Sequence, residues 1–403
     1  MGFMKLKKNI SIMLVIGLMS STLIGCSNTS SDAGKSLDKE NARKANNELI
    51  AAVTSEPETG FDATDTGHGD MTSVFFSTLF KRNKNLGMEN DLAKSYEISE
   101  DRLIWTVKIR EDVKFTDGEN LTAEDVVYTY EIAKNSGSSI DLTMLDSVSK
   151  VDDYTVEFKL KNPQSTFIEK LATVGIVPKH AHNEGFSDNP IGSGPYKLVQ
   201  WDKGQQVIAE ANENYYGEKP SIKKLTMVFM DDDTAYAAVK AGEVDITSIP
   251  GSFAKEEVEG KKLIELDSIE TYGVAYPMEK PGKTTADGYP IGNAVTSDET
   301  IRKALTYAID REELVEGILE GYGAPSSTGL EKMPWLNEET IIKPEEDGKI
   351  DEAKKMLEEA GWKDTNNNGT IDKNGVEAEF DLLYTDGKYR QELGLAYVEV
   401  AKK

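Results

Sequence analysis

The sequence predicts an α/β protein that is built from more than one lobe. Residues 224–246 read as an apolar strand, a helix and a second short strand, which is the β-α-β order of a largely parallel sheet. About 355 residues follow a polar segment near the N-terminus, and such a length exceeds what one hydrophobic core usually holds. Residues 191–220 begin with a Gly-Ser-Gly-Pro hinge and continue as a hairpin of two alternating strands.

The N-terminus has the features of an export signal. Three lysines precede an uncharged run, residues 10–24, that is too short to span a bilayer comfortably. This run ends in Leu-Ile-Gly-Cys and resembles the lipobox of bacterial lipoproteins, and Cys26 is the one cysteine in the chain. We therefore expect residues 1–25 to be a lipoprotein signal peptide and Cys26 to be lipidated. The alternative is a plain signal peptide or membrane anchor that contains a cysteine.

Residues 26–47 are mostly Ser, Asp, Asn, Lys and Gly, and they contain almost nothing apolar. Such a segment cannot bury enough surface to offset its chain entropy, so the sequence predicts a disordered tether. The whole chain has 46 basic and 71 acidic residues, a formal net charge of −25. This charge argues against a nucleic-acid partner, because phosphate contacts require clustered Lys and Arg. It also keeps the body of the protein off an anionic membrane surface.

Alternating apolar and polar residues at 103–109 and 154–160 predict strands with one buried face. A helical pattern lies between them after Thr122, which has the side chain of an N-cap residue. Residues 86–189 therefore form a compact α+β unit in this interpretation.

Three short motifs allow a metal or phosphate interpretation beside a simpler one. His180 and His182 have a spacing that some metal sites use, but without a third His or Cys nearby a surface turn is the alternative. The acidic run 231–233 resembles a metal cluster, and its alternative is the N-cap of the following helix. Residues 282–284 resemble the end of a phosphate-binding loop, but Pro277 stands where the first glycine is required, which excludes that loop.

Residues 364–372 match part of a calcium loop of the EF-hand kind. Glycine occupies position 6, but Gly375 stands at position 12, where a bidentate Glu normally completes the shell. The alternative is a polar loop of Asx turns. The calcium ligands would be Asp364, Asn366, Asn368, Thr370 and Asp372.

Four segments together resemble the extracellular solute-binding proteins of peptide and nickel ABC importers. The first contains Val-Lys-Phe-Thr-Asp-Gly followed by Thr-Ala-Glu-Asp-Val, and the second contains Gly-Ser-Gly-Pro-Tyr with a later Asn-Tyr-Tyr-Gly-Glu-Lys-Pro. The third contains Ile-Arg-Lys-Ala-Leu with Ala-Ile-Asp-Arg, and the fourth contains Ala-Lys-Lys-Met-Leu with Ala-Gly-Trp. They occupy residues 108–127, 192–220, 301–311 and 353–362, in the order that the family has.

The resemblance implies an α/β, periplasmic-binding-protein-like fold of the class II or cluster C type, with lobes around a ligand cleft and an extra α+β lobe. Lobe I would comprise residues 48–85 and 190–267, lobe II residues 86–189, and lobe III residues 268–403. The ligand would meet the loop after the first strand and the glycine hinge. His68 is either a ligand-contacting imidazole or a solvated loop residue. The residues implied are Gly67, His68, Gly69, Met71, Ser193 and Gly194.

The implied function is the lipid-anchored substrate-binding component of an ABC importer, located on the extracytoplasmic side of the cell membrane. It would capture oligopeptides or dipeptides and deliver them to the permease, which works with ATPase subunits. A nickel or other metal-chelate binder of the same family is one alternative, and a secreted hydrolase or adhesin is another. The sequence has no Gly-x-Ser-x-Gly, His-Glu-x-x-His or Cys-x-x-Cys motif, so we expect no enzyme and no cofactor beyond the possible structural calcium.

The C-terminal residues 390–403 predict an amphipathic helix with no following segment. Members of the family normally continue beyond such a helix, so we expect lobe III to be truncated and the apolar stripe of this helix to be uncovered. The stripe consists of Leu393, Ala396, Tyr397 and Val400.

Overall fold

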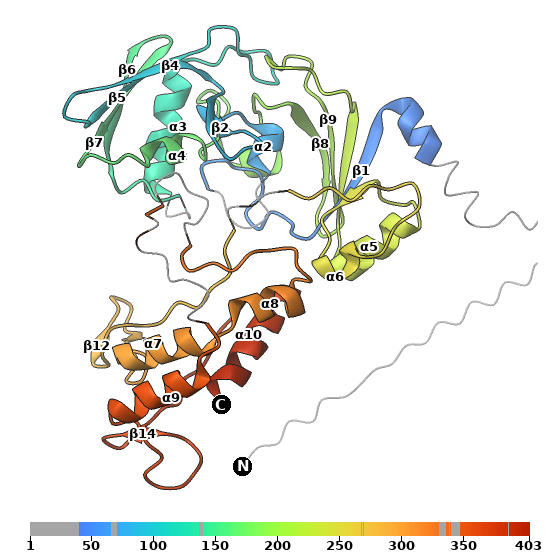
Figure 1. Ribbon diagram of the computed structural model, residues 1–403. Coiled ribbons are helices and arrows are strands. Elements are labelled where there is room, and N and C mark those ends of the chain that lie inside the picture. The colour runs from blue at the N-terminus through green and yellow to red at the C-terminus, as the bar shows by residue number, and fades with distance from the viewer. Residues whose placement is uncertain are drawn as a thin grey trace, which may run out of the picture.

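The computed structural model describes residues 40–65, 71–136, 140–266, 268, 270–329, 336–337, 339, 347–385 and 387–403. The two largest sheets have five and four strands. Figure 1 shows them side by side, with a group of helices beneath them. The predicted signal peptide, Cys26, Gly67, His68 and Gly69 lie outside the described residues. Within the described ranges, no helix has both the length and the apolar character that a membrane crossing requires.

Lobe I is organised around a mixed sheet. Its strands are β1 (Glu48–Val53), β8 (Tyr196–Asp202), β9 (Gln206–Ala211), β10 (Lys224–Phe229) and β11 (Ile246–Thr247), in the order β11-β1-β10-β9-β8. β1 pairs in parallel with β10 and β11, which flank the helix α5 (Asp232–Lys240) in the chain. β8 pairs antiparallel with β9 in the predicted hairpin, and β9 also pairs antiparallel with β10. The prediction of a largely parallel core is therefore wrong for half of the strand pairs.

The acidic run after β10 caps a helix. The Asp231 carboxylate accepts a hydrogen bond from the Thr234 amide at 2.9 Å, at the N-cap position of α5. This geometry confirms the capping alternative for the acidic run, since an N-cap carboxylate satisfies a backbone donor at the positive end of the helix dipole.

The glycine hinge packs against the short helix α2 (Thr72–Phe75). A Cβ atom on Gly192 would lie 1.9 Å from the Phe75 carbonyl oxygen, and one on Gly194 would lie 2.5 Å from the Phe75 carbonyl carbon. The Gly194 amide donates to the same carbonyl oxygen at 3.0 Å. Both positions therefore require glycine because two backbones approach closely.

Lobe II has a four-stranded antiparallel sheet with one helix across it (Figure 1). The sheet order is β4-β5-β7-β6, and Thr122 and Asp125 form a capping box at the start of α3. Phe80, at the end of lobe I in the predicted boundaries, also belongs to the lobe II core. The elements are β2 (Phe80–Arg82), β3 (Met88–Asn90), β4 (Ala93–Ile98), β5 (Ile104–Ile109), α3 (Ala123–Asn135), β6 (Leu145–Asp152), β7 (Thr155–Leu160), α4 (Phe167–Leu171) and the 3₁₀-helix η1 (Phe186–Asp188).

Lobe III consists mainly of helices. They are α7 (Glu299–Ala308), α8 (Arg311–Ile318), α9 (Ile350–Glu359) and α10 (Lys388–Ala401). Two small hairpins accompany them, β12 (Lys283–Thr284) with β13 (Pro290–Ile291) and β14 (Asp372–Lys373) with β15 (Val376–Glu377). A connecting segment leads from lobe I to this lobe, and its described residues, 261–266, 268 and 270–277, have no regular structure.

The C-terminal helix α10 is better covered than the sequence predicts. Tyr397 is buried and its hydroxyl hydrogen-bonds that of Tyr276 at 2.8 Å. Val400 packs against the buried alanine cluster of α7 and α9. The expectation of an uncovered stripe therefore needs correction, because Tyr397 is buried and Leu393, Ala396 and Val400 are partly buried against segments that precede α10 in the chain.

The predicted tether is helical at its end. Residues 40–46 form a helix, so the expectation of a disordered tether through residue 47 needs correction. The helix is held by Arg43, whose guanidinium makes two hydrogen bonds to the Asp245 carboxylate at 2.8 and 3.0 Å. Arg43 also donates to the Gly242 carbonyl oxygen. The polar composition did not predict this helix, because a partly buried ion pair, rather than an apolar face, fixes it.

Candidate ligand-binding cleft

A cleft of about 3100 Å³ lies between lobe I and lobe III. One wall is the edge of the lobe I sheet where the parallel strands β1 and β11 end. The other wall is formed by the end of α8 and the start of α10, and residues of the connecting segment, among them 261–266 and 270–274, also line the cleft. Open α/β sheets bind ligands outside the carboxyl ends of their strands, so the position agrees with a binding role.

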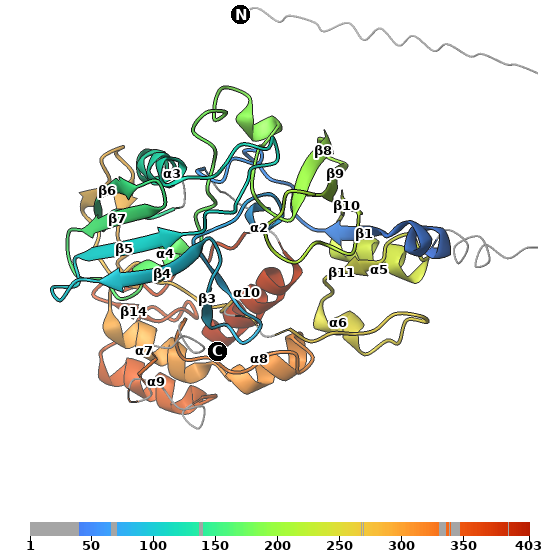
Figure 2. The ribbon, with the colours of Figure 1, turned by 90° about the horizontal axis from the view of Figure 1, so that it is seen from above.

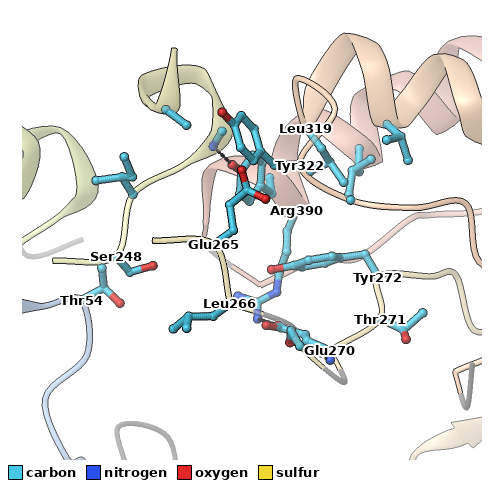
Figure 3. Close-up of a pocket in the computed structure, with 18 of the residues that line it drawn as sticks. Thr54, Ser248, Glu265, Leu266, Glu270, Thr271, Tyr272, Leu319, Tyr322 and Arg390 are labelled. Carbon is cyan, nitrogen blue, oxygen red and sulfur yellow. Dashed lines mark hydrogen bonds and ion pairs between the residues drawn. The ribbon is translucent and has the colours of Figure 1, made fainter. Parts of the chain in front are cut away.

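The sheet wall of the cleft is polar. Thr54 follows β1 directly and Ser248 follows β11 directly, and both are exposed. Figure 3 shows their hydroxyl groups close together on one side of the cleft. Thr247 is held below them, because its hydroxyl donates to the Ser248 carbonyl oxygen at 3.1 Å. This wall therefore offers hydroxyl donors and acceptors rather than charge.

The opposite wall joins aromatic rings to a charged pair (Figure 3). The Arg390 guanidinium lies 5.9 Å from the centre of the Tyr272 ring and 3.8 Å from the Glu270 carboxylate. The two charged side chains are 43% and 57% exposed, so water screens their attraction. Burial raises the pKa of Tyr272, which keeps this phenol neutral. Tyr322 and Leu319 extend this wall at the end of α8.

Apolar side chains on the connecting segment face the same space. Leu266 is 84% exposed, and Glu265 beside it lines the cleft together with Tyr322 (Figure 3). Leu383, on the extended segment before α10, is also exposed and lines the cleft. The cleft thus combines hydroxyl groups, both signs of charge and exposed aliphatic side chains.

Asp245 has a structural role at the edge of the cleft. Burial favours a higher pKa for this carboxyl, but hydrogen bonds from Arg43 and from the Ile50 amide outweigh burial and lower the pKa. The carboxylate joins the N-terminal helix to β1 and is already paired.

The structure separates the predicted ligand residues. Met71 is almost buried and lines the cleft. Ser193 is fully buried, and neither it nor Gly194 lines the cleft. Gly194 packs closely on Phe75, and the Ser193 carbonyl oxygen accepts a hydrogen bond from the Ser77 hydroxyl at 3.1 Å. These contacts support a role in the core of lobe I, and ligand contact by Ser193 and Gly194 stays an untested prediction. The predicted contacts of Gly67, His68 and Gly69 fall outside the described residues.

The two histidines of the predicted turn bind different carboxylates. His180 Nε2 lies 2.8 Å from an Asp117 oxygen, and His182 Nε2 lies 2.9 Å from an Asp62 oxygen. His182 Nδ1 also contacts the Tyr128 hydroxyl at 3.0 Å. Among the described residues, no group of three His, Cys, Asp or Glu side chains is placed to hold a metal ion.

The loop at 364–372 contains the hydrogen bonds of Asx turns. The Asp364 carboxylate accepts from the amides of Asn368 at 3.2 Å and Gly369 at 2.9 Å. The side-chain oxygens of Asn366 and Asn368 accept from backbone amides two residues further on.

Two further carboxylates contribute to this loop. Asp372 accepts hydrogen bonds from the Thr365 amide and hydroxyl, and Glu377 accepts from the side-chain amides of Asn366 and Asn368. The polar-loop alternative describes this geometry, and calcium binding by Asp364, Asn366, Asn368, Thr370 and Asp372 stays an untested prediction.

The chain is similar to known proteins both in sequence and in fold. The family described as "Bacterial extracellular solute-binding proteins, family 5 Middle" matches residues 87–403. The chain is 31% identical to the oligopeptide-binding protein AppA of Bacillus subtilis over 415 aligned positions, which cover 98% of this chain and 74% of AppA.

Two solved structures are similar in fold. NikZ from Campylobacter jejuni in complex with Ni(L-His) has a TM-score of 0.70 and 28% identity, over 88% of this chain and 71% of that one. AppA from Bacillus subtilis in complex with a nonapeptide has a TM-score of 0.68 and 30% identity, over 88% and 72%. The fold and the cleft define a ligand-binding protein of the periplasmic-binding-protein kind. The chain belongs to the bacterial extracellular solute-binding proteins, family 5, which the four sequence motifs predicted.

Sequence reasoning missed the residues of the lobe III wall. The sequence assigned Arg390 only to an amphipathic helix, and it assigned no role to Tyr272. Neither has a local motif, since the fold alone brings them together across more than one hundred positions.

Proposed function

We propose that this chain is the lipid-anchored substrate-binding component of an ABC importer, and that it captures peptides outside the membrane and delivers them to the permease. The proposal is supported by its family and by its relative AppA, which is named as an oligopeptide-binding protein. The permease and its ATPase subunits are the expected partners. The family is named for solute binding and not for catalysis.

The size of the cleft favours a peptide over a metal chelate as the ligand. Pockets for small molecules usually enclose about 300–1,000 Å³, whereas this cleft has about 3100 Å³. A metal chelate would leave most of that space to water. An extended peptide would fill more of it, pair its backbone with the hydroxyl groups of Thr54 and Ser248, and leave its side chains in hydrated space.

Binding would act by differential affinity for two arrangements of the lobes. A ligand that touches both walls binds more tightly when the walls are closer, and it shifts the population by that difference. The described residues of the connecting segment, 261–266, 268 and 270–277, have no regular structure, so they offer little resistance to such a movement.

A thermal-shift screen tests the proposal. The full chain is heated with peptides of two to nine residues and, separately, with Ni(L-His). A peptide at one hundred times its Kd should stabilise the folded state by about 2.7 kcal/mol. Stabilisation by peptides and none by the chelate is the expected result. If no peptide of any length shifts the melting temperature, peptide capture is wrong.

A nickel or other metal-chelate binder is the second candidate, favoured by the similarity to NikZ in complex with Ni(L-His). Two of the three histidines, His180 and His182, are already paired with carboxylates in lobes I and II. A shift by Ni(L-His) that is lost in His68→Ala would favour this candidate. A secreted hydrolase or adhesin remains the remote alternative, and turnover of ester, peptide or glycoside substrates by the purified protein would support the hydrolase.

The anchor is tested separately. We expect lipid on Cys26, so Cys26→Ala should release the protein from the membrane fraction of an expressing bacterium and change its mobility. A variant that stays as firmly membrane-bound as the wild type, with unchanged mobility, would refute lipidation.

A further inference from the structure

The short helix α6 (Gly251–Ala254) lies between lobe I and lobe III and is fixed to lobe I by one side. The Phe253 ring stacks on the Tyr236 ring of α5, with centroids 4.4 Å apart and planes 3° apart. Glu256, just after α6, accepts a hydrogen bond from the Tyr236 hydroxyl at 2.8 Å and forms an ion pair with Lys240 at 2.6 Å. Helix α6 therefore moves with lobe I.

The same helix contacts lobe III through different residues. The Gly251 amide donates to the Tyr389 hydroxyl of α10, and the Lys255 ammonium forms an ion pair with Glu320 after α8. Gly251 also lies against the Leu319 backbone, because a Cβ atom there would be 2.5 Å from the Leu319 carbonyl oxygen. Figures 1 and 2 both show α6 beside the end of α8.

The covalent connection between the lobes cannot fix their separation by itself. Residues 261–266 and 270–277 have no regular structure, and several of their apolar side chains are exposed. A separation that the chain does not enforce must be set by contacts, and those of α6 are located where the two walls of the cleft meet.

We propose that α6 is an interlobe latch: Gly251 and Lys255 hold Tyr389, Leu319 and Glu320 of lobe III and so set the spacing of the two walls of the cleft. The effect of the latch on ligand affinity rests on the proposed function, because the latch sets the width of the proposed ligand-binding cleft. Its effect on the spacing of the lobes is independent of any ligand.

The latch gives the cleft a preferred width before ligand arrives. If only a fraction of molecules has the binding-competent width, the apparent affinity falls by that fraction. Loss of one half-exposed ion pair should therefore weaken ligand binding by roughly two- to five-fold.

Spin-label distances test the latch on the full chain without ligand. Cys26→Ser removes the native thiol, and label sites at Val199 on β8 and Lys355 on α9 report the separation of lobes I and III, since both side chains are exposed. Lys255→Glu and Glu320→Lys should each broaden the distribution and lengthen the mean distance, and the double exchange should restore both. The matched control is Lys94→Glu, which breaks an exposed pair with Glu111 inside lobe II at 3.0 Å and should leave the distance unchanged.

A second variant tests the steric contact. Gly251→Ala inserts a methyl group against the Leu319 carbonyl oxygen and should push the lobes apart. Its control is Gly317→Ala in α8, where no heavy atom lies within 4 Å of the added methyl.

Unchanged distances in both Lys255→Glu and Gly251→Ala would overturn the latch, as would a double exchange that fails to restore the wild-type distance. Equal broadening in Lys94→Glu would also overturn it, by assigning the effect to net charge. These outcomes do not depend on ligand. A chain that binds no peptide would refute the proposed function, and the latch would still be tested by the spin-label distances alone.

Discussion

Lobes II and III differ in local structure and in packing, since lobe II is built on a four-stranded sheet and lobe III mainly on helices. In lobe II one continuous cluster forms the core, and large side chains such as Tyr130, Phe158 and Phe167 are fully buried in it. In lobe III the core is divided into two small clusters, and Leu383 is 90% exposed. The difference teaches that lobe II carries its own stability, whereas lobe III depends on contacts with its neighbours and with whatever enters the cleft.

The largest expected effect compares a core position of lobe II with an exposed apolar position of lobe III. Phe158→Ala removes a ring that packs edge-on against Tyr130 at 4.9 Å and Phe167 at 5.6 Å, and should cost about 3–5 kcal/mol of unfolding free energy. Leu383→Ala should change it by less than about 0.5 kcal/mol. Chemical denaturation of both variants checks this. Similar losses would show that Leu383 is packed in solution and that the two lobes do not differ as described.

The next effect concerns the glycine hinge. Gly194→Val places side-chain atoms where the Phe75 backbone lies, so it should destabilise lobe I by roughly 1–3 kcal/mol. Gly273→Ala, where an added Cβ meets no atom within 4 Å, is the control. Hydrogen exchange should report faster opening of β1 and α2 in Gly194→Val only. Normal protection of these elements would mean that lobe I relaxes around the new side chain.

An intermediate effect should depend on pH. Burial alone would raise the pKa of Asp298, but hydrogen bonds from Lys373, Thr300 and Trp362 lower it to about 2. The carboxyl is near 3.9 when unfolded, so its ionised form stabilises the fold above about pH 4, and this contribution is lost as the pH falls towards 2. Asp298→Asn should remove roughly 1–2 kcal/mol at pH 7 and flatten the acid side of the stability profile of lobe III. If the wild type and the variant lose the same amount of stability below pH 4, the stabilising role of ionised Asp298 is wrong.

The smallest effect is expected at the surface of lobe III. Lys303 pairs with Glu299 one turn earlier in α7, and both side chains are more than half exposed. Lys303→Ala should therefore cost no more than about 0.5 kcal/mol. A larger loss of unfolding free energy, measured by thermal melting, would mean that Trp362 and its neighbours hold α7 less firmly than the buried cluster indicates.

The sequence predicted the elements with strong local patterns and missed contacts between distant residues. The alternating strands of lobe II and the capping residues Thr122 and Asp231 follow from neighbouring residues alone, and the structure has them. The helix at 40–46 was missed because Arg43 is held by Asp245, about two hundred positions away. Gly194 was placed at the ligand by motif, but its spatial neighbour is Phe75, which no pattern along the chain reveals.

The candidate site was predictable as a location and not as a set of residues. Four motifs indicated a cleft between lobes, and Met71 does line it. The Tyr272, Arg390 and Tyr322 wall comes from three segments that only the fold assembles. Single aromatic and charged residues in such segments look the same as ordinary surface residues, so periodicity and spacing could not identify them.

Hydrogen exchange with and without a stabilising peptide tests the central claim, that the cleft between lobes I and III binds the ligand. The account predicts that the ligand slows amide exchange on both walls at once, in the proteolytic fragments of the protein that contain Thr54, Ser248 and Tyr322. Exchange in the four-stranded sheet of lobe II should be unchanged. Protection confined to lobe II, or to one wall of the cleft, would contradict it.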